Sequence, residues 1–105
     1  MARPIESVNS QDFKEVLHTP FQVEMDGASP VTLELVAVDE PGAPPHVEVF
    51  CLHFRGPSRP VLPQLIHRMQ HDGLGSLQIF LTPLSSDETG TVYEAVFNRV
   101  RKKQS

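Results

Sequence analysis

Short runs of β-type residues, each ended by proline or glycine, constrain the fold of this chain more than any other feature. The runs are Phe21–Met25, Val31–Val38, Val47–Phe54, Leu77–Leu81 and Thr91–Val100. Residue pairs such as Asp26-Gly27 and Thr89-Gly90 separate them, and residues of these types set the backbone angles of tight turns. Apolar and polar residues alternate in several runs, as in strands with one buried face. The pattern therefore predicts a small all-β domain.

One short helix is expected before the first strand. Ser10 is of the type that caps helix N-termini, and the predicted helix covers Gln11–His18. Its apolar stripe consists of Phe13, Val16 and Leu17. A helix of this length is not stable alone, so we expect it to dock on the sheet.

The segment Leu62–His71 is ambiguous. Apolar residues recur there at helical spacing, and Gly73 is placed to end a helix, so the pattern alone slightly favours a helix. As a strand, the segment has Leu65, His67 and Met69 on one face and Ile66 and Arg68 on the other.

Charge and composition exclude several classes of function. Nine Lys and Arg against thirteen Asp and Glu give a net charge of −4, which argues against nucleic-acid binding because phosphate contacts need a basic face. No stretch approaches the ~20 apolar residues of a membrane helix. The single Cys51 excludes an internal disulfide, and the N-terminus has no signal-peptide pattern. We therefore expect a cytoplasmic protein that binds neither nucleic acid nor membrane.

Three strings carry a resemblance to a known family. They are FCLHFRGP at 50–57, HDGLG at 71–75 followed by LQIFLTP at 77–83, and YEAVFN at 93–98. In this order they resemble DUF6916, a family of small bacterial proteins of unknown function, over about residues 12–100. The resemblance implies a strand at 64–70, although Ile66-His67 departs from the aromatic residue expected there. It implies no activity, cofactor or catalytic residue, and it suggests partners in a phage-tail-like assembly.

The expected architecture is all-β and mainly antiparallel, with about six strands in a small barrel or sandwich and one short N-terminal helix. At 105 residues the chain forms one domain. We expect a loose N-terminus at 1–9, a single β domain at 10–100 and a basic C-terminal tail at 101–105.

Histidine and cysteine residues offer two kinds of site chemistry. Cys51 and His53 lie two residues apart and could form half of a zinc site, with His67 and His71 as the other half, but no CxxC or HExxH spacing supports it. Cys51 could also act as a nucleophile beside a histidine and Asp72. A thiol between Phe50 and Leu52 is expected to be buried, with a raised pKa, so an inert cysteine is the simpler interpretation. We expect no metal and no cofactor.

Arg55 is the polar residue that stands out most, because it follows an apolar strand and precedes a Gly-Pro corner. It can pair with a carboxylate such as Glu94, bind loop carbonyls, or recognise an acidic group on a ligand or partner. Arg55, His53 and His67 are therefore the candidate contact residues.

Three functions are compatible with these features. The first is a non-enzymatic structural or protein-interaction module that self-associates or binds another protein. The second is a barrel that binds a small molecule, with Arg55 and a histidine at its mouth. The third is a hydrolase or metal enzyme that uses Cys51, His53 and His67. The lack of a catalytic signature favours the first.

Overall fold

The computed structural model describes residues 8–100, which form one short helix and six strands. The elements are α1 (Ser10–Lys14), β1 (Pro20–Val23), β2 (Val31–Asp39), β3 (Val47–Gly56), β4 (Leu65–His71), β5 (Gly75–Asp87) and β6 (Gly90–Val100). The predicted all-β fold with one N-terminal helix is confirmed.

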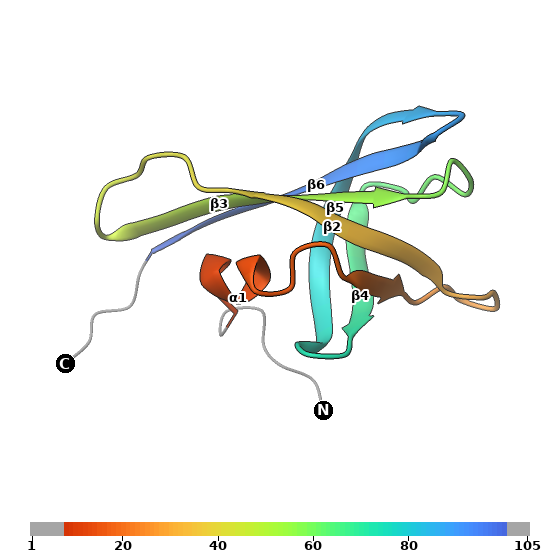
Figure 1. Ribbon diagram of the computed structural model, residues 1–105, viewed down its shortest axis with the longest axis horizontal. Coiled ribbons are helices and arrows are strands. Elements are labelled where there is room, and N and C mark those ends of the chain that lie inside the picture. The colour runs from red at the N-terminus through yellow and green to blue at the C-terminus, as the bar shows by residue number, and fades with distance from the viewer. Residues whose placement is uncertain (1–7, 101–105) are drawn as a thin grey trace.

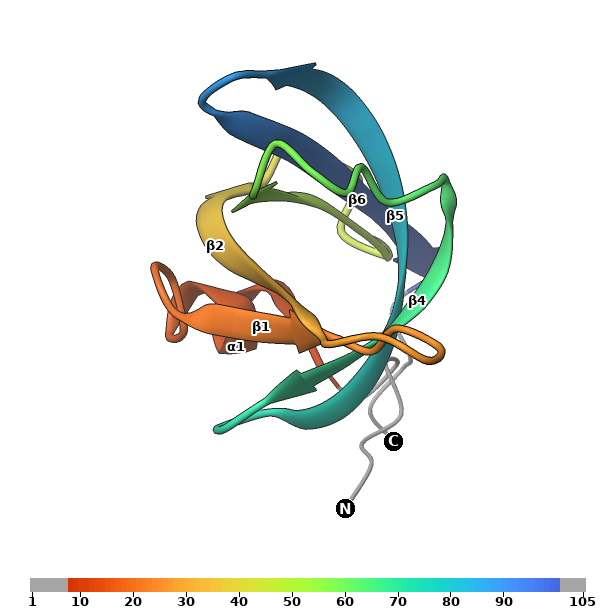
Figure 2. The ribbon, with the colours of Figure 1, turned by 90° about the vertical axis from the view of Figure 1, so that its right-hand side faces the viewer.

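The six strands pair in the order β1-β2-β3-β6-β5-β4, and β4 returns to β1, so that the sheet closes into a small barrel. Every pairing is antiparallel. The closing contact is short, since only Gln22 and Val23 of β1 pair with β4. Seen from one end, the strands surround a single interior (Figure 2).

The ambiguous segment is a strand, so the helical pattern was misleading there. His67, Met69 and His71 of β4 are buried on its inner face, while Ile66 and Arg68 face solvent. All seven residues of β4 pair with β5, from Leu65↔Leu81 to His71↔Gly75. This pairing supplies the hydrogen bonds that a helix would have made within itself.

The helix is shorter than predicted, and its cap is one residue earlier. Asn9 is the N-cap, and its side chain and that of Asp12 form a reciprocal capping box. The helix ends at Lys14 because the following chain already pairs with β2: the His18 N–H donates to the Leu35 carbonyl at 2.7 Å.

The packed domain begins earlier than Ser10. Val8 is fully buried in the core and Asn9 caps α1, so neither belongs to a loose N-terminus. The rest of the predicted N-terminal segment and the basic tail at 101–105 lie outside the described residues. Within residues 8–100, no helix has the length and apolar character needed to cross a membrane.

Two strands contain irregularities that the sequence pattern did not reveal. The register of β2 shifts between Leu35 and Ala37, so Val38, rather than Ala37, packs against the core. The register of β5 shifts between Pro83 and Ser85, which lets the strand continue to Asp87. Pro83 was expected to end this strand, but a bulge tolerates a residue that cannot donate to the ladder.

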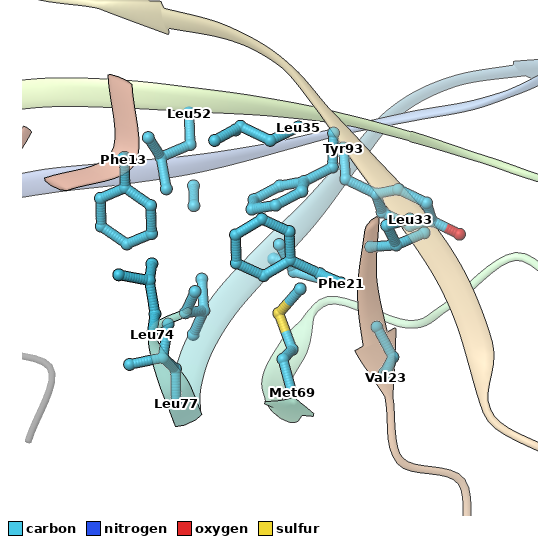
Figure 3. Packing of buried hydrophobic residues seen from close by; sticks show 14 of the residues in the cluster. Phe13, Phe21, Val23, Leu33, Leu35, Leu52, Met69, Leu74, Leu77 and Tyr93 are labelled. Carbon is cyan, nitrogen blue, oxygen red and sulfur yellow. The ribbon is translucent and has the colours of Figure 1, made fainter. Parts of the chain in front are cut away.

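The barrel interior is filled by side chains from α1 and the surrounding strands (Figure 3). Phe21 meets Phe54 edge to face, with ring centroids 5.2 Å apart. Tyr93 is also fully buried, and its hydroxyl oxygen accepts a hydrogen bond of 2.8 Å from the backbone N–H of Leu62. This bond fixes the chain between β3 and β4 over the core, where a polar backbone group needs a partner.

The turn between β5 and β6 depends on Gly90. Its φ is +145°, and an added Cβ would lie 2.7 Å from the Gly56 carbonyl oxygen. A Cβ on Gly56 would in turn contact the buried Leu33 side chain. Glycine is therefore required at Gly90 by both backbone conformation and close approach, and a larger residue at Gly56 would require the Leu33 side chain to shift.

Candidate functional site

His53 is the centre of a polar cluster on the outer face of the barrel. It lies on β3 directly opposite Glu94 of β6, and its Nε2 is 3.1 Å from the Glu94 carboxylate. Its Nδ1 is 3.8 Å from the carboxylate of Asp39 on β2. Nε2 is thus within hydrogen-bond distance of one carboxylate, which orients the imidazole, whereas Nδ1 lies beyond that distance from the other.

The cluster borders an open hollow of about 430 Å³, which we call the acidic hollow. Its lining consists of Asp39, Glu40, Pro41, Cys51, His53 and Glu94. Glu40 also forms an ion pair with Lys14 of α1. Carboxylates outnumber basic groups here, so the hollow favours a positively charged group on a binding partner.

Cys51 is half-buried on this outer face, not in the core as expected. Partial burial raises the pKa of its thiol, and the nearby Glu94 and Asp39 carboxylates raise it further. A nucleophilic cysteine needs the opposite environment, because the thiolate is the reactive form. Asp72, the expected third partner, lies in the turn between β4 and β5 beside His71.

The divided zinc site finds no support in the geometry. Cys51 and His53 face outward from β3, whereas His67 and His71 face inward from β4. Across residues 8–100, no three or more His, Cys, Asp or Glu side chains come together in a way that could hold a metal ion.

Arg55 binds a loop carbonyl. Its Nη2 donates to the backbone oxygen of Thr89 at 2.9 Å, in the turn between β5 and β6. Asp87 accepts bonds from the hydroxyl and N–H of Thr89, and these bonds lower the pKa of its carboxyl, with Arg55 adding a smaller effect. Arg55 therefore fixes this turn, and Glu94, its other candidate partner, binds His53 instead.

His67 is separated from the other two candidate residues by the barrel wall. Its side chain faces inward, and Nε2 donates to the Pro63 carbonyl at 2.8 Å. Arg55 and His53 face outward from β3. The structure thus does not bring Arg55, His53 and His67 into one site.

His71 forms a polar network with two neighbouring segments, and the sequence interpretation missed this role. Its Nδ1 accepts hydrogen bonds from the backbone N–H groups of Gly73 and Leu74, at 2.9 and 3.0 Å. A neutral ring therefore carries its proton on Nε2, which donates to the Thr19 hydroxyl at 2.7 Å; that hydroxyl donates to the Val16 carbonyl. Burial lowers the pKa of His71, and Asp72 opposes this shift in part.

Two large apolar side chains stand exposed side by side on the outer face. Ile66 of β4 and Phe80 of β5 are direct cross-strand partners, with exposed fractions of 65% and 49%. We call Ile66 and Phe80 the outer apolar row.

Comparison with known families decides the assignment. The model of one family, a domain of unknown function designated DUF6916, matches residues 8–97. The chain belongs to the DUF6916 family. No curated protein and no solved structure matches the chain.

The DUF6916 strings seen in the sequence correspond to structural contacts. The first contains Arg55, which holds the Thr89 carbonyl, and the second contains His71, which holds the β4–β5 turn. The third begins at Tyr93, whose hydroxyl accepts from Leu62. These three side chains stabilise turns and loops around the barrel.

Proposed function

We propose that this DUF6916 domain is a non-enzymatic structural or protein-interaction module, which binds a partner protein through the outer apolar row. The exposed row carries this proposal. These two large apolar side chains remain in solvent although the interior already holds a hydrophobic core. Contiguous exposed apolar surface of this kind commonly marks a protein contact.

The acidic hollow defines the chemistry of the partner. The hollow lies near the row, because Glu94 of its lining pairs with Thr82 of β5, two residues from Phe80. A matching surface has apolar side chains bordered by Lys or Arg. The family resemblance suggests a component of a phage-tail-like assembly as this partner, and the proposal keeps the cytoplasmic location without nucleic-acid or membrane binding.

The alternative, a small-molecule-binding barrel, requires Arg55 and a histidine at one mouth. Arg55 holds Thr89, and His67 points into the barrel toward Pro63. Aromatic and aliphatic side chains pack the interior that a ligand would have to enter. We therefore favour the interaction module.

Co-expression with the products of adjacent genes tests the proposal. We expect one of them to co-purify stoichiometrically with the wild-type chain. The double variant Ile66→Thr/Phe80→Ser should lose this partner while it keeps its fold, because both side chains are largely exposed.

The matched control is Val61→Thr/Leu84→Thr, which changes two side chains of similar exposure, 46% and 52%, outside the row. This variant should retain the partner. Failure of every neighbouring product to co-purify, or equal capture by the row variant and the control, would argue against the proposed function.

A further inference from the structure

The far half of β6 has an unpaired edge within the part of the chain that the structure describes. Pairing with β5 ends at Glu94, whereas pairing with β3 continues to Val47↔Val100. Within residues 8–100, no backbone hydrogen bond from a turn or loop reaches this edge. In Figure 1, β5 turns away while β3 and β6 continue side by side. Such an edge offers unpaired N–H and C=O groups to another strand.

Proline and charged residues on an edge strand usually prevent such pairing, and this edge has few of them. Ala95–Val100 contains no proline, and its only charged residue is Arg99. The Arg99 side chain is engaged with its own barrel: Nε donates to Glu48 at 2.9 Å, and the guanidinium lies over the Phe50 ring. Val96 and Val100 point outward and are 60% and 75% exposed. Within residues 8–100, this edge is therefore apolar and pairs with no other strand.

We propose that β6 of one chain pairs antiparallel with β6 of a second copy, about a two-fold axis at Asn98. Because the axis relates the two copies, this register brings Val96 of each chain opposite Val100 of the other chain on the outer face. Phe97 then faces Arg99 of the second copy on the inner face. β-branched pairs and aromatic–cation pairs are favourable cross-strand neighbours.

Other registers match less well. Centring the axis on Phe97 places Val100 opposite Glu94, and centring it on Arg99 places two guanidinium groups opposite each other. Like charges directly opposed on a sheet are destabilising. The sequence of the edge thus complements itself best about Asn98, which favours a second copy over an unrelated strand.

The inference rests on the proposed function, since it names one partner of the same module, but it uses a different surface.

Light scattering after size-exclusion chromatography, over a dilution series, tests the β6 pairing. The wild-type chain should elute with twice the monomer mass at high concentration. Val96→Lys/Val100→Lys, which opposes like charges in the proposed register, should be monomeric throughout.

The matched control is Val96→Lys/Val100→Glu. It introduces two charges at the same exposed positions, but the register at Asn98 brings opposite charges together, so the dimer should return. A second measurement uses Asn98→Cys with Cys51→Ala, oxidised with copper–phenanthroline. Two cysteines at the axis should form a disulfide-linked dimer, because directly opposed residues of paired strands have Cα atoms within disulfide range.

A wild-type monomer at every concentration, together with no cross-link at position 98, would overturn the β6 pairing. Equally stable dimers of Val96→Lys/Val100→Lys and Val96→Lys/Val100→Glu would also overturn the β6 pairing. If the wild type is monomeric and Val96→Lys/Val100→Lys loses a co-purified protein, the edge binds a strand of that protein instead of a second copy. None of these results alters the Ile66 and Phe80 test, so the two proposals fail separately.

Discussion

Replacing His71 with alanine should lower the free energy of unfolding by about 2–3 kcal/mol at pH 8. Each buried N–H left without its partner costs ~1–3 kcal/mol, and Leu74 is buried. The variant also loses the ring beside Phe21, where the centroids are 4.4 Å apart. Urea unfolding followed by circular dichroism measures the difference.

The contribution of His71 should also depend on pH, with a definite sign. Burial lowers its pKa in the folded state below the unfolded value of about 6.5, so the unfolded chain binds more protons between the two values. The stabilisation is complete above about pH 6.5 and declines as the pH falls, since protonation of Nδ1 breaks the bonds from Gly73 and Leu74.

The difference in stability between wild type and His71→Ala should therefore shrink from pH 8 to pH 5.5. Other histidines titrate in both proteins, so their effects cancel in this comparison. A constant difference across this range would show that the His71 network does not respond to protonation as described.

Replacing Phe13 with alanine should have the largest effect of any single change in α1, about 3–5 kcal/mol, because it removes a fully buried aromatic side chain. The Phe13 ring lies 6.0 Å from the rings of both Phe50 and Phe97. A helix of five residues has little stability of its own, so this contact holds it on the barrel.

Leu17→Ala serves as the control, because Leu17 is 36% exposed and close in sequence to Phe13. Leu17→Ala should lower the free energy of unfolding much less than Phe13→Ala does. Phe13→Leu keeps most of the apolar volume and should give an intermediate loss if the alanine variant fails to fold. A loss below about 1 kcal/mol for Phe13→Ala would mean that α1 is not part of the core, since deleting a buried aromatic costs several times more.

The strands were predictable from the sequence wherever alternation and turn residues agreed, as in β3 with Phe50, Leu52 and Phe54 inward. The features that were missed depend on long-range pairing. The helix ends early because the His18 N–H bonds to the Leu35 carbonyl. Strand β5 continues past Pro83 because the strand has a bulge there. Both contacts join two different elements, whereas periodicity describes the pattern within one segment.

The candidate site was less predictable for the same reason. Glu94 could be named as a partner for Arg55, but the β3–β6 register places it opposite His53. His71 appeared as half of a metal site because its spacing from His67 was visible, whereas its bond to Thr19 spans 52 positions. The outward position of Ile66, opposite Phe80, became apparent only once β4 was placed as a strand.

Hydroxyl-radical footprinting tests most directly whether the outer apolar row is a protein contact. In the isolated chain, Ile66 and Phe80 should be oxidised readily, since they are 65% and 49% exposed. In the co-purified complex, oxidation of both should fall sharply, while Val61 and Leu84 stay as reactive as before. Unchanged oxidation of Ile66 and Phe80 in a stable complex would contradict the account.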